Sequence, residues 1–523
     1  MKASSSWRFI VFFNIVAGML LLTELTFRYY ADEIAGDYLK QTFQKQTKGK
    51  YQLQYDDWTV GLLGGNTSFE NLQITPVDTL MKETKAFIKF KKVALNGLSY
   101  YTLITKKGEL FNSLKITKGW ASVFSNKQLK SDTAKRFQVP AKLQQMELGK
   151  IEVDSVQVRT YQQDSTGKKL LAQAIVNVSL QDIAYHNEEG KLVPFLAKGV
   201  EMKANDIMLY DFSDAYTLSV DSIGISTHDS TLWVNAFALK PIYGEQEHSA
   251  RKGISKDRID LELGAVRGHG VEVDSMLYGH YMLRRLELDS VNLQVFKNKQ
   301  FPVNGKFKKL PQQLLRELKS KVRIDTLQVR DTYAAYEELT KNSSIAGKVF
   351  FTNLQLTATN VSNIEANNPV IQLDAKTRLM GEGTCDIHIQ MPVYNPENRF
   401  EVKGTLGSMD LKTLNRALNP LAMMEVEMGS LHKMDFGFSA VETVSNGWMD
   451  IQYENLKVKL LRKKDKDTNK FLTKIANIFV KKDKEESKHS KIKFKRDQSK
   501  SFLNYCWKSI LSGIKDASVA DLN

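Results

Sequence analysis

The residue types best suited to chemistry are thinly spread along this sequence. Its eight histidines form no HExxH pattern, no pair at i and i+4 and no cluster with cysteine, so the sequence predicts no metal site. These histidines are His186, His228, His248, His269, His280, His388, His432 and His489. The glycine-containing stretches 61–65 and 264–270 lack the Lys-Ser/Thr of a phosphate-binding loop and are interpreted as turns. Because no G-x-S-x-G nucleophile motif occurs either, we expect no enzyme and no cofactor.

One short pattern recurs five times and is the most distinctive feature of the sequence. The octet apolar-x-apolar-Asp-Ser/Thr-apolar-x-apolar occupies 151–158, 218–225, 271–278, 286–293 and 322–329. Its apolar positions change parity at the Asp-Ser/Thr step, and a β-bulge there would return all four to one face of a strand. The predicted bulge residues are Asp154, Asp221, Asp274, Asp289 and Asp325. The alternative is that these acids mark turns between two short strands.

The first two apolar positions of each octet are the candidate lining of an apolar groove. They are Ile151, Val153, Leu218, Val220, Val271, Val273, Leu286, Leu288, Val322 and Ile324.

The elements that would position these residues are mostly strands. Residues 50–460 alternate with period two in short runs rich in Val, Ile, Leu, Tyr and Thr. Predicted strands include 86–95, 114–124, 175–180, 232–239, 349–356, 387–391 and 448–458. Predicted helices are 33–45, 311–319 and 411–418, the last stopped by Pro420. Since the octets are unevenly spaced, a solenoid of fixed period is excluded. We expect a mainly β fold, an elongated curled antiparallel sheet.

The length of 523 residues exceeds what one ordinary core supports, about 250 to 300 residues. The predicted organisation is an N-terminal anchor (1–30), an N-terminal β module (31–150), a central sheet with the octets (151–398), a C-terminal β module (399–461) and a basic tail (462–523). Cys385 and Cys506 are the only cysteines, which excludes a disulfide framework.

Residues 9–27 form an apolar run that reaches about 28 Å as a helix, at ~1.5 Å per residue, and this is just enough to span a bilayer. Trp7 and Arg8 precede the run, and Arg28 and Tyr29 follow it. A cleaved signal peptide is the competing interpretation, but no small-x-small cleavage site follows the apolar core. We predict an uncleaved anchor with the following chain exported.

The net charge of +15 is concentrated near the C-terminus, since 462–500 hold 15 Lys/Arg and 6 Asp/Glu, a net of +9 (15 − 6). Such a run is either a solvated tail or a patch for anionic lipid headgroups, and we expect no nucleic-acid partner. A second short helix is predicted at 471–480, and 502–514 form an amphipathic helix. Its candidate membrane-contact residues are Phe502, Leu503, Trp507, Ile510 and Leu511. Packing of this helix back onto the β body is the alternative.

The most specific text lies in 399–461. Residues 399–420 read RFEVKGTLGSMDLKTLNRALNP, and 428–431, 434–438 and 447–453 read MGSL, MDFGF and GWMDIQY. This stretch resembles the C-terminal region of the AsmA-like family of bacterial envelope proteins. The resemblance implies an inner-membrane-anchored periplasmic protein of a Gram-negative bacterium with a hydrophobic β-groove, similar to the bridge-like lipid transfer proteins. Phospholipid and the inner membrane are its implied partners.

Three function classes follow. The leading hypothesis is a non-enzymatic protein that supports phospholipid transport or outer-membrane homeostasis. The second is an assembly or scaffold factor that binds outer-membrane or surface proteins along sheet edges. The third, an enzyme acting on surface glycans, requires a pair of carboxylates that converge in a cleft.

Overall fold

The computed structural model describes residues 36–61, 64–77, 85–105, 107–125, 146–164, 167–185, 195–210, 212, 215–276, 278–303, 305–341, 343–461 and 486–519. The chain divides into two compact units. Unit 1 comprises Met1–Tyr210 and Val220–Ser230, and unit 2 comprises Asp211–Ser219 and Thr231–Asn523. The division therefore passes through strand β11 (Tyr216–Ser226).

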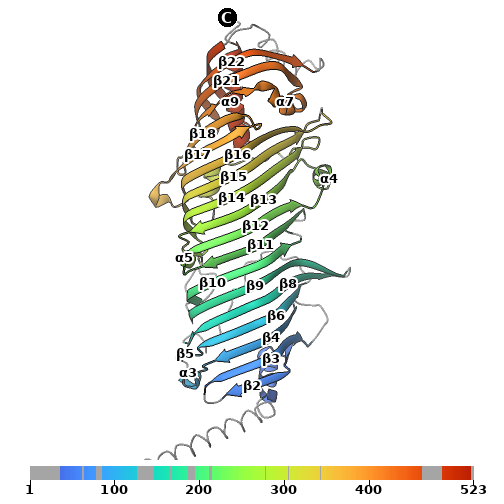
Figure 1. The fold of residues 1–523 in the computed structure, drawn as a ribbon, viewed down its shortest axis with the longest axis vertical. Helices are drawn as coiled ribbons and strands as arrows, with labels where there is room; N and C mark the ends of the chain where they lie inside the picture. The colour runs from blue at the N-terminus through green and yellow to red at the C-terminus, as the bar shows by residue number, and fades with distance from the viewer. Residues whose placement is uncertain are drawn as a thin grey trace, which may run out of the picture. The chain divides into compact units, whose positions relative to one another are not determined.

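Unit 1 is an open sheet whose strands follow one another nearly in chain order (Figure 1). Strands β1 and β2 both pair with β3, and the sheet continues through β4, β6, β8, β9 and β10. The strands are β1 (Tyr51–Gln54), β2 (Asp57–Gly61), β3 (Asn66–Pro76), β4 (Lys85–Asn96), β5 (Gly108–Glu109), β6 (Ser113–Ser125), β7 (Met146–Leu148), β8 (Lys150–Asp164), β9 (Gly167–Tyr185) and β10 (Phe195–Leu209). Its described helices are α2 (Asp37–Gln46) and α3 (Tyr100–Thr105).

Unit 2 is likewise an open sheet that runs from β12 to β23. Its strands are β12 (Thr231–Pro241), β13 (Asp257–His269), β14 (Tyr281–Asn298), β15 (Val322–Leu339), β16 (Gly347–Ser362), β17 (Val370–Leu379), β18 (Gly383–Pro392), β19 (Phe400–Leu406), β20 (Met409–Asp410), β21 (Met424–Ala440), β22 (Val444–Leu460) and β23 (Glu486–Lys495). Its helices are α4 (Glu245–Ala250), α5 (Val273–Met276), α6 (Pro311–Arg316), η3 (Glu365–Asn367), η4 (Leu411–Leu414), α7 (Asn415–Ala422) and α9 (Phe502–Val519).

The mainly β prediction is confirmed, and every predicted strand lies inside an observed one. The strands are longer than their apolar cores: 175–180 is the middle of β9, and 349–356 is half of β16. The prediction of a purely antiparallel sheet is wrong, because β6–β8, β5–β7 and β14–β15 pair in parallel. A parallel neighbour requires a crossover connection. The chain between β14 and β15 provides one, and it carries α6.

The three predicted helices are present with shifted bounds, as α2, α6 and η4 followed by α7. Pro420 does not stop the last of them, since it lies inside α7, which ends two residues later at Ala422. A proline in the last turn of a helix removes one backbone hydrogen bond, but no further helical turn follows that it could disrupt. The predicted 471–480 helix and the predicted 9–27 anchor lie outside the described residues. Among the described helices, none combines the length and hydropathy needed to cross a bilayer.

One octet contains a bulge of the predicted kind, and a second has a left-handed residue at the same step without an extra residue. In β8, Asp154 and Ser155 together oppose the single residue Asn177 of β9, and Ser155 has φ +55°. The Ser155 N–H donates to Asn177 Oδ1 at 2.9 Å, and its hydroxyl donates to Asp154 at 2.6 Å. In β14, Ser290, next to Asp289, also has φ +55°. A left-handed residue inside a strand turns the following side chains to the other face.

The other three octets differ. In β15 the register with β16 stays intact at Asp325 and shifts later, between Val329 and Thr332, around Asp331 (φ +46°), and again between Thr332 and Ala334. In β11, no residue of the octet has positive φ, and Asp221 is exposed between buried Val220 and Ser222.

The fifth octet, 271–278, is no strand, because its centre forms the helical turn α5 around Asp274. Gly270 (φ +64°) and Gly279 (φ +71°) bracket this segment and turn the chain at both of its ends. The turn predicted at 264–270 is also wrong, since Gly264 to His269 continue β13.

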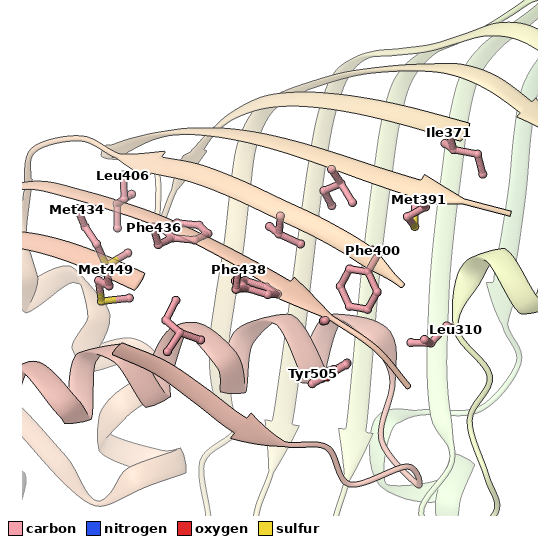
Figure 2. Close-up of a cluster of buried hydrophobic side chains, with 14 of the residues drawn as sticks. Leu310, Ile371, Met391, Phe400, Leu406, Met434, Phe436, Phe438, Met449 and Tyr505 are labelled. Atoms are coloured by element: carbon pink, nitrogen blue, oxygen red, sulfur yellow. The ribbon is translucent and has the colours of Figure 1, made fainter. Parts of the chain in front are cut away.

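The main hydrophobic core lies at the C-terminal end of unit 2, where α9 covers one face of β19, β21, β22 and β23 (Figure 2). Phe400, Met449, Ile492 and Tyr505 are almost completely buried there. Phe400 packs edge-on against Tyr505 at 5.8 Å and against Phe502 at 5.2 Å between ring centroids. Burial of each such side chain contributes about 1.5–3 kcal/mol, so this packing fixes α9 on the sheet.

Helix α9 also satisfies the outer edge of β23. The Lys491 N–H donates to Asp516 at 2.7 Å, and the Lys493 N–H donates to Ser512 at 3.2 Å. These side chains occupy donors that an added strand would use.

Candidate functional site

Two apolar rows cross the unit 2 sheet on the face that α9 covers, and we call this the inner face. Residues paired across neighbouring strands project to the same side, so the register defines each row. The first row is Val234, Val266, Leu288, Val329, Leu356, Ala375, Ile387, Gly404, Phe436 and Met449. The second row is Leu232, Gly268, Leu286, Leu327, Ala358, Leu373, Ile389, Val402 and Phe438.

Coverage of the inner face changes along these rows. Beneath α9, Val402, Phe436, Phe438 and Met449 are at most 4% exposed. Over β12 to β16 the side chains of these rows are only half-buried, at Val234 and Leu288 for example, with the exception of Ala358 at 3% exposure. Leucine and valine in a finished core are normally covered completely. The described part of the chain therefore leaves a broad apolar surface partly open to solvent on β12 to β16.

Unit 1 has an apolar face of the same kind. One of its rows is Phe69, Val93, Ile116, Val153, Val178 and Met202, and a second is Leu95, Leu114, Ile151, Leu180 and Val200. These side chains are half-buried, apart from Met202, which is 45% exposed. The aliphatic character of these rows continues across β4, β6, β8, β9 and β10.

The opposite face of unit 2 is polar. One of its rows is Arg267, Glu287, Gln328, Thr357, Asp374, His388 and Lys403. Its charges pair across strands: Arg330 contacts Glu287 at 2.9 Å and Asp289 at 3.0 Å. This face thus has the composition of a solvated sheet surface, and the apolar side chains are concentrated on the inner face.

The structure places the octet residues differently from one octet to the next. Ile151 and Val153 belong to the unit 1 rows, and Leu286 and Leu288 belong to the inner face of unit 2. The remaining candidates lie in β11, in or beside α5, and at the start of β15; they are Leu218, Val220, Val271, Val273, Val322 and Ile324. Val220 and Val271 are buried, at 7% and 4% exposure. The structure therefore places the predicted lining positions of only two octets on the apolar rows, while the octet 322–329 contributes its last two apolar residues, Leu327 and Val329.

Sequence reasoning missed most of the rows. Val234, Val266, Val329 and Leu356 lie outside the predicted lining, although three of them fall in segments whose alternation predicted strands or octets. Alternation along 232–239 and 349–356 is the signal that identifies them. The octet pattern identifies Asp-Ser/Thr steps, whereas the rows are formed by the aliphatic alternation that the strands share.

The predicted membrane-contact residues do not share one face of α9. Phe502 and Ile510 pack into the hydrophobic core, which corrects their assignment as membrane contacts. Leu503 and Trp507 point away from it, with 76% and 51% exposure, and Leu511 is half-buried. The packing of α9 onto the β body, the alternative considered above, is what the structure shows.

The opposite face of unit 2 has an open depression of about 480 Å³, lined in part by Asp374, His388, Asp435 and Trp448. Its charged groups are paired with neighbouring side chains. His388 contacts Asp374 at 2.7 Å, and Asp435 accepts hydrogen bonds from Thr405 at 2.7 Å and contacts Lys433 at 2.8 Å. Lys433 and Thr405 lower the pKa of Asp435 despite its desolvation, so this carboxylate is charged and engaged rather than a poised proton acceptor.

Within the described ranges, no three His, Cys, Asp or Glu side chains converge as metal ligands. His186 lies outside those ranges, and Cys385 and Cys506 are free. No protein-family model and no curated protein matches this chain.

Proposed function

We propose that this chain is a non-enzymatic, membrane-anchored envelope protein whose apolar sheet faces bind the acyl chains of phospholipids. The observation that carries the proposal is the pair of aliphatic rows on the inner face of unit 2, half-buried from β12 to β16. A contiguous apolar surface of this extent, with a polar face on the other side of the same strands, is typical of a binding surface. Unit 1 carries apolar rows of the same kind.

The setting of this activity is proposed from the sequence. The 9–27 run would anchor the chain in the inner membrane, and the body would lie in the periplasm of a Gram-negative bacterium. The resemblance of 399–461 to the AsmA-like family supports a role in phospholipid transport or outer-membrane homeostasis. The competing role, capture of client proteins by strand addition, is disfavoured at β23, whose outward N–H groups already donate to Asp516 and Ser512.

The proposal is tested by placing a charge on each face of one strand. Val329→Glu puts a carboxylate on the inner face, whereas Gln328→Glu puts the same group one residue away on the polar face. Full-length protein is purified from membranes, and its bound lipid is counted by mass spectrometry. We expect Val329→Glu to lose most of the bound phospholipid, because an unpaired charge among acyl chains costs several kcal/mol.

Gln328→Glu should retain the lipid content of the wild-type protein. Circular dichroism checks that both variants keep their strand content. A wild-type protein without phospholipid, or equal lipid loss from both variants, would rule out acyl-chain binding on the inner face.

A further inference from the structure

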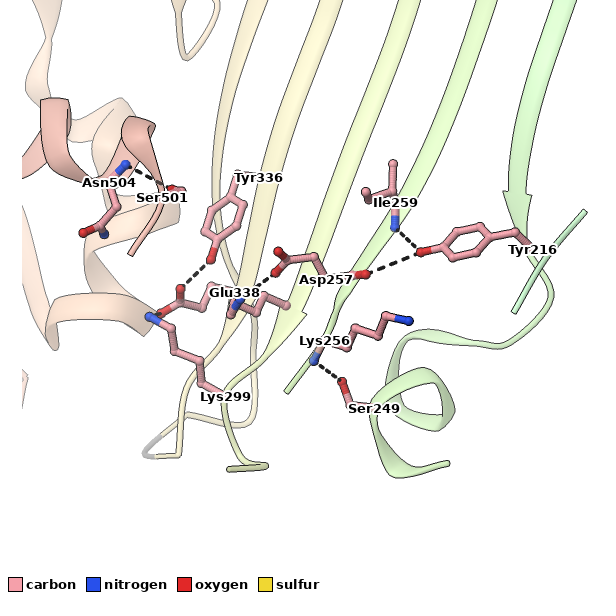
Figure 3. A network of polar contacts seen from close by, with 11 residues as sticks. Tyr216, Ser249, Lys256, Asp257, Ile259, Lys299, Tyr336, Glu338, Ser501 and Asn504 are labelled. Atoms are coloured by element: carbon pink, nitrogen blue, oxygen red, sulfur yellow. Dashed lines mark hydrogen bonds and ion pairs between the residues drawn. The ribbon is translucent and has the colours of Figure 1, made fainter. Parts of the chain in front are cut away.

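At one end of β13, β14 and β15, the side chains on the inner face of unit 2 change from apolar to charged. Going along the strands, the paired side chains change from Leu261, Leu293 and Ala334 to Ile259, Val295 and Tyr336. The next paired set on the same face is Asp257, Lys297 and Glu338. With Lys299 and Tyr336, these three residues form what we call the polar rim (Figure 3). The inner face thus changes from aliphatic to charged over two successive positions of the same face along each strand.

The rim contains two ion pairs. Lys297 contacts Asp257 at 2.6 Å, and Lys299 contacts Glu338 at 2.7 Å. The Tyr336 hydroxyl donates to the other oxygen of Glu338 at 2.7 Å. Asp257 and Lys299 are the accessible members, with side chains 46% and 37% exposed, while Glu338 is only 12% exposed. One negative and one positive group of the rim therefore face outward, and Tyr336 is itself 38% exposed.

Several hydrogen-bond donors and acceptors of the polar rim remain available to a ligand. An ammonium has three donors, and among the described residues Lys297 and Lys299 each donate to one carboxylate. Among the described residues, the exposed Asp257 carboxylate accepts a side-chain hydrogen bond from Lys297, and it has further lone pairs. A ligand can therefore bond to Asp257 and Lys299 without breaking either ion pair.

Two tyrosines hold the rim in place. The Tyr216 hydroxyl accepts the Ile259 N–H at 3.0 Å and donates to the Asp257 carbonyl at 3.4 Å, which fixes the end of β13 (Figure 3). Tyr336 lies between the aliphatic and charged sets. Burial raises the pKa of Tyr336, and the nearby charges of Glu338 and Asp257 raise it further. Its hydroxyl consequently stays protonated and continues to donate to Glu338.

We propose that the polar rim binds the headgroup of a zwitterionic glycerophospholipid whose acyl chains lie on the apolar rows. The headgroup ammonium contacts Asp257, and its phosphate contacts Lys299. The rim carries two ammonium and two carboxylate groups, so it offers no net positive charge to favour an anionic lipid. This inference rests on the proposed function, because the acyl chains require the inner face.

The test offers the full-length protein equal amounts of two phospholipids with identical acyl chains. One has an ethanolamine headgroup and the other a glycerol headgroup, and the lipid that the protein extracts from mixed vesicles is measured by mass spectrometry. The wild-type protein should enrich the ethanolamine lipid by about tenfold, the ratio expected for one charge-assisted hydrogen bond. Asp257→Asn and Lys299→Gln should each reduce this enrichment while total bound lipid is unchanged.

Asp260→Asn is the matched control, since Asp260 lies on the opposite face of β13, where it contacts Lys240 at 2.8 Å. This variant should retain the wild-type enrichment. Equal uptake of the two lipids by the wild-type protein, enrichment of the glycerol lipid, or rim variants with unchanged enrichment would each overturn the headgroup site. Those results leave acyl-chain binding intact, whereas absence of any bound lipid contradicts the proposed function itself.

Discussion

Ser445 of β22 and Ser509 of α9 share a hydrogen bond of 2.7 Å between two hydroxyl groups that are both inaccessible to solvent. Ser509 also donates to the Tyr505 carbonyl at 2.9 Å, one turn earlier in the helix. Both serines are 0% exposed, so no solvent water replaces a lost partner. A polar contact inside an apolar interface fixes the position of α9 on the sheet more closely than aliphatic packing alone.

Ser509→Ala should therefore destabilise the C-terminal part of unit 2 by about 1–3 kcal/mol, because it removes a buried hydrogen bond to the Ser445 hydroxyl. Ser445→Ala should have a smaller effect, since Ser509 keeps its bond to the Tyr505 carbonyl. The double variant should cost less than the sum of the single changes. Chemical denaturation of all four proteins gives the coupling free energy. Strict additivity would mean that the two hydroxyls do not stabilise one another.

A second buried polar group, His248, makes the stability of unit 2 depend on pH. His248 lies in α4, is 3% exposed and contacts the Tyr216 ring at 5.7 Å. Burial, and then the charges of Lys256 and Arg258, lower the pKa of His248 below its ordinary 6.5. The unfolded chain therefore binds a proton before the folded chain does as the pH falls. This contribution to stability is complete above about pH 6.5 and is lost as the pH falls toward the lowered pKa of the folded state.

His248→Phe removes the titrating group while it keeps an aromatic side chain against Tyr216. The free energy of unfolding of this variant should fall less than that of the wild-type protein between pH 7.5 and pH 5.5. His228→Phe is the control for replacing a histidine by phenylalanine, because the His228 side chain is 85% exposed. Parallel curves for His248→Phe and the wild-type protein would show that His248 does not contribute to the pH dependence of the free energy of unfolding.

How far the sequence predicts this fold depends on the range of the interaction involved. Alternation along 86–95 or 448–458 is a local property, and it predicted β4 and β22 correctly. The amphipathic pattern of 502–514 likewise predicted α9. The parallel pairing of β14 with β15 was missed, because it depends on the crossover that carries α6 and not on either strand. Asp274 shows the same limit at short range, since Gly270 and Gly279 override an octet that forms strand elsewhere.

The candidate surface was predicted only in part for a related reason. Leu288 stood out because it belongs to an octet, but its partners Val266 and Val329 are revealed by register, which depends on neighbouring strands. The polar rim has no local signature either. Asp257, Lys297 and Glu338 are ordinary charged residues at strand ends, and only the pairing of three strands brings them together.

The kink in β8 gives a further prediction. Ser155 has φ +55°, a conformation that costs a residue with a side chain roughly 1–2 kcal/mol and a β-branched residue the most. Ser155→Val should therefore be destabilising by about that amount, whereas Ser155→Gly should be neutral or slightly stabilising. Ser179→Val tests the same change in β9 at a residue that has no positive φ, and should be tolerated. Thermal or chemical denaturation compares the three; equal effects at 155 and 179 would contradict a left-handed kink at Ser155.

The two cysteines report directly on the docking of α9. Cys506 packs against the core from α9, and Cys385 contributes to the same core from β18. Burial raises the pKa of the Cys506 thiol to about 12 and that of Cys385 to about 11. The thiolate is the reactive form, so at pH 8 both residues should react with a disulfide reagent at least about a hundredfold more slowly than an ordinary thiol of pKa about 8.5. Cys506 should be the slower of the two. Single variants, Cys385→Ser and Cys506→Ser, assign each rate, and unfolding in denaturant should restore ordinary reactivity to both. Fast labelling of Cys506 in the folded Cys385→Ser protein would show that α9 leaves the sheet readily, and that the end of the inner face it covers is accessible.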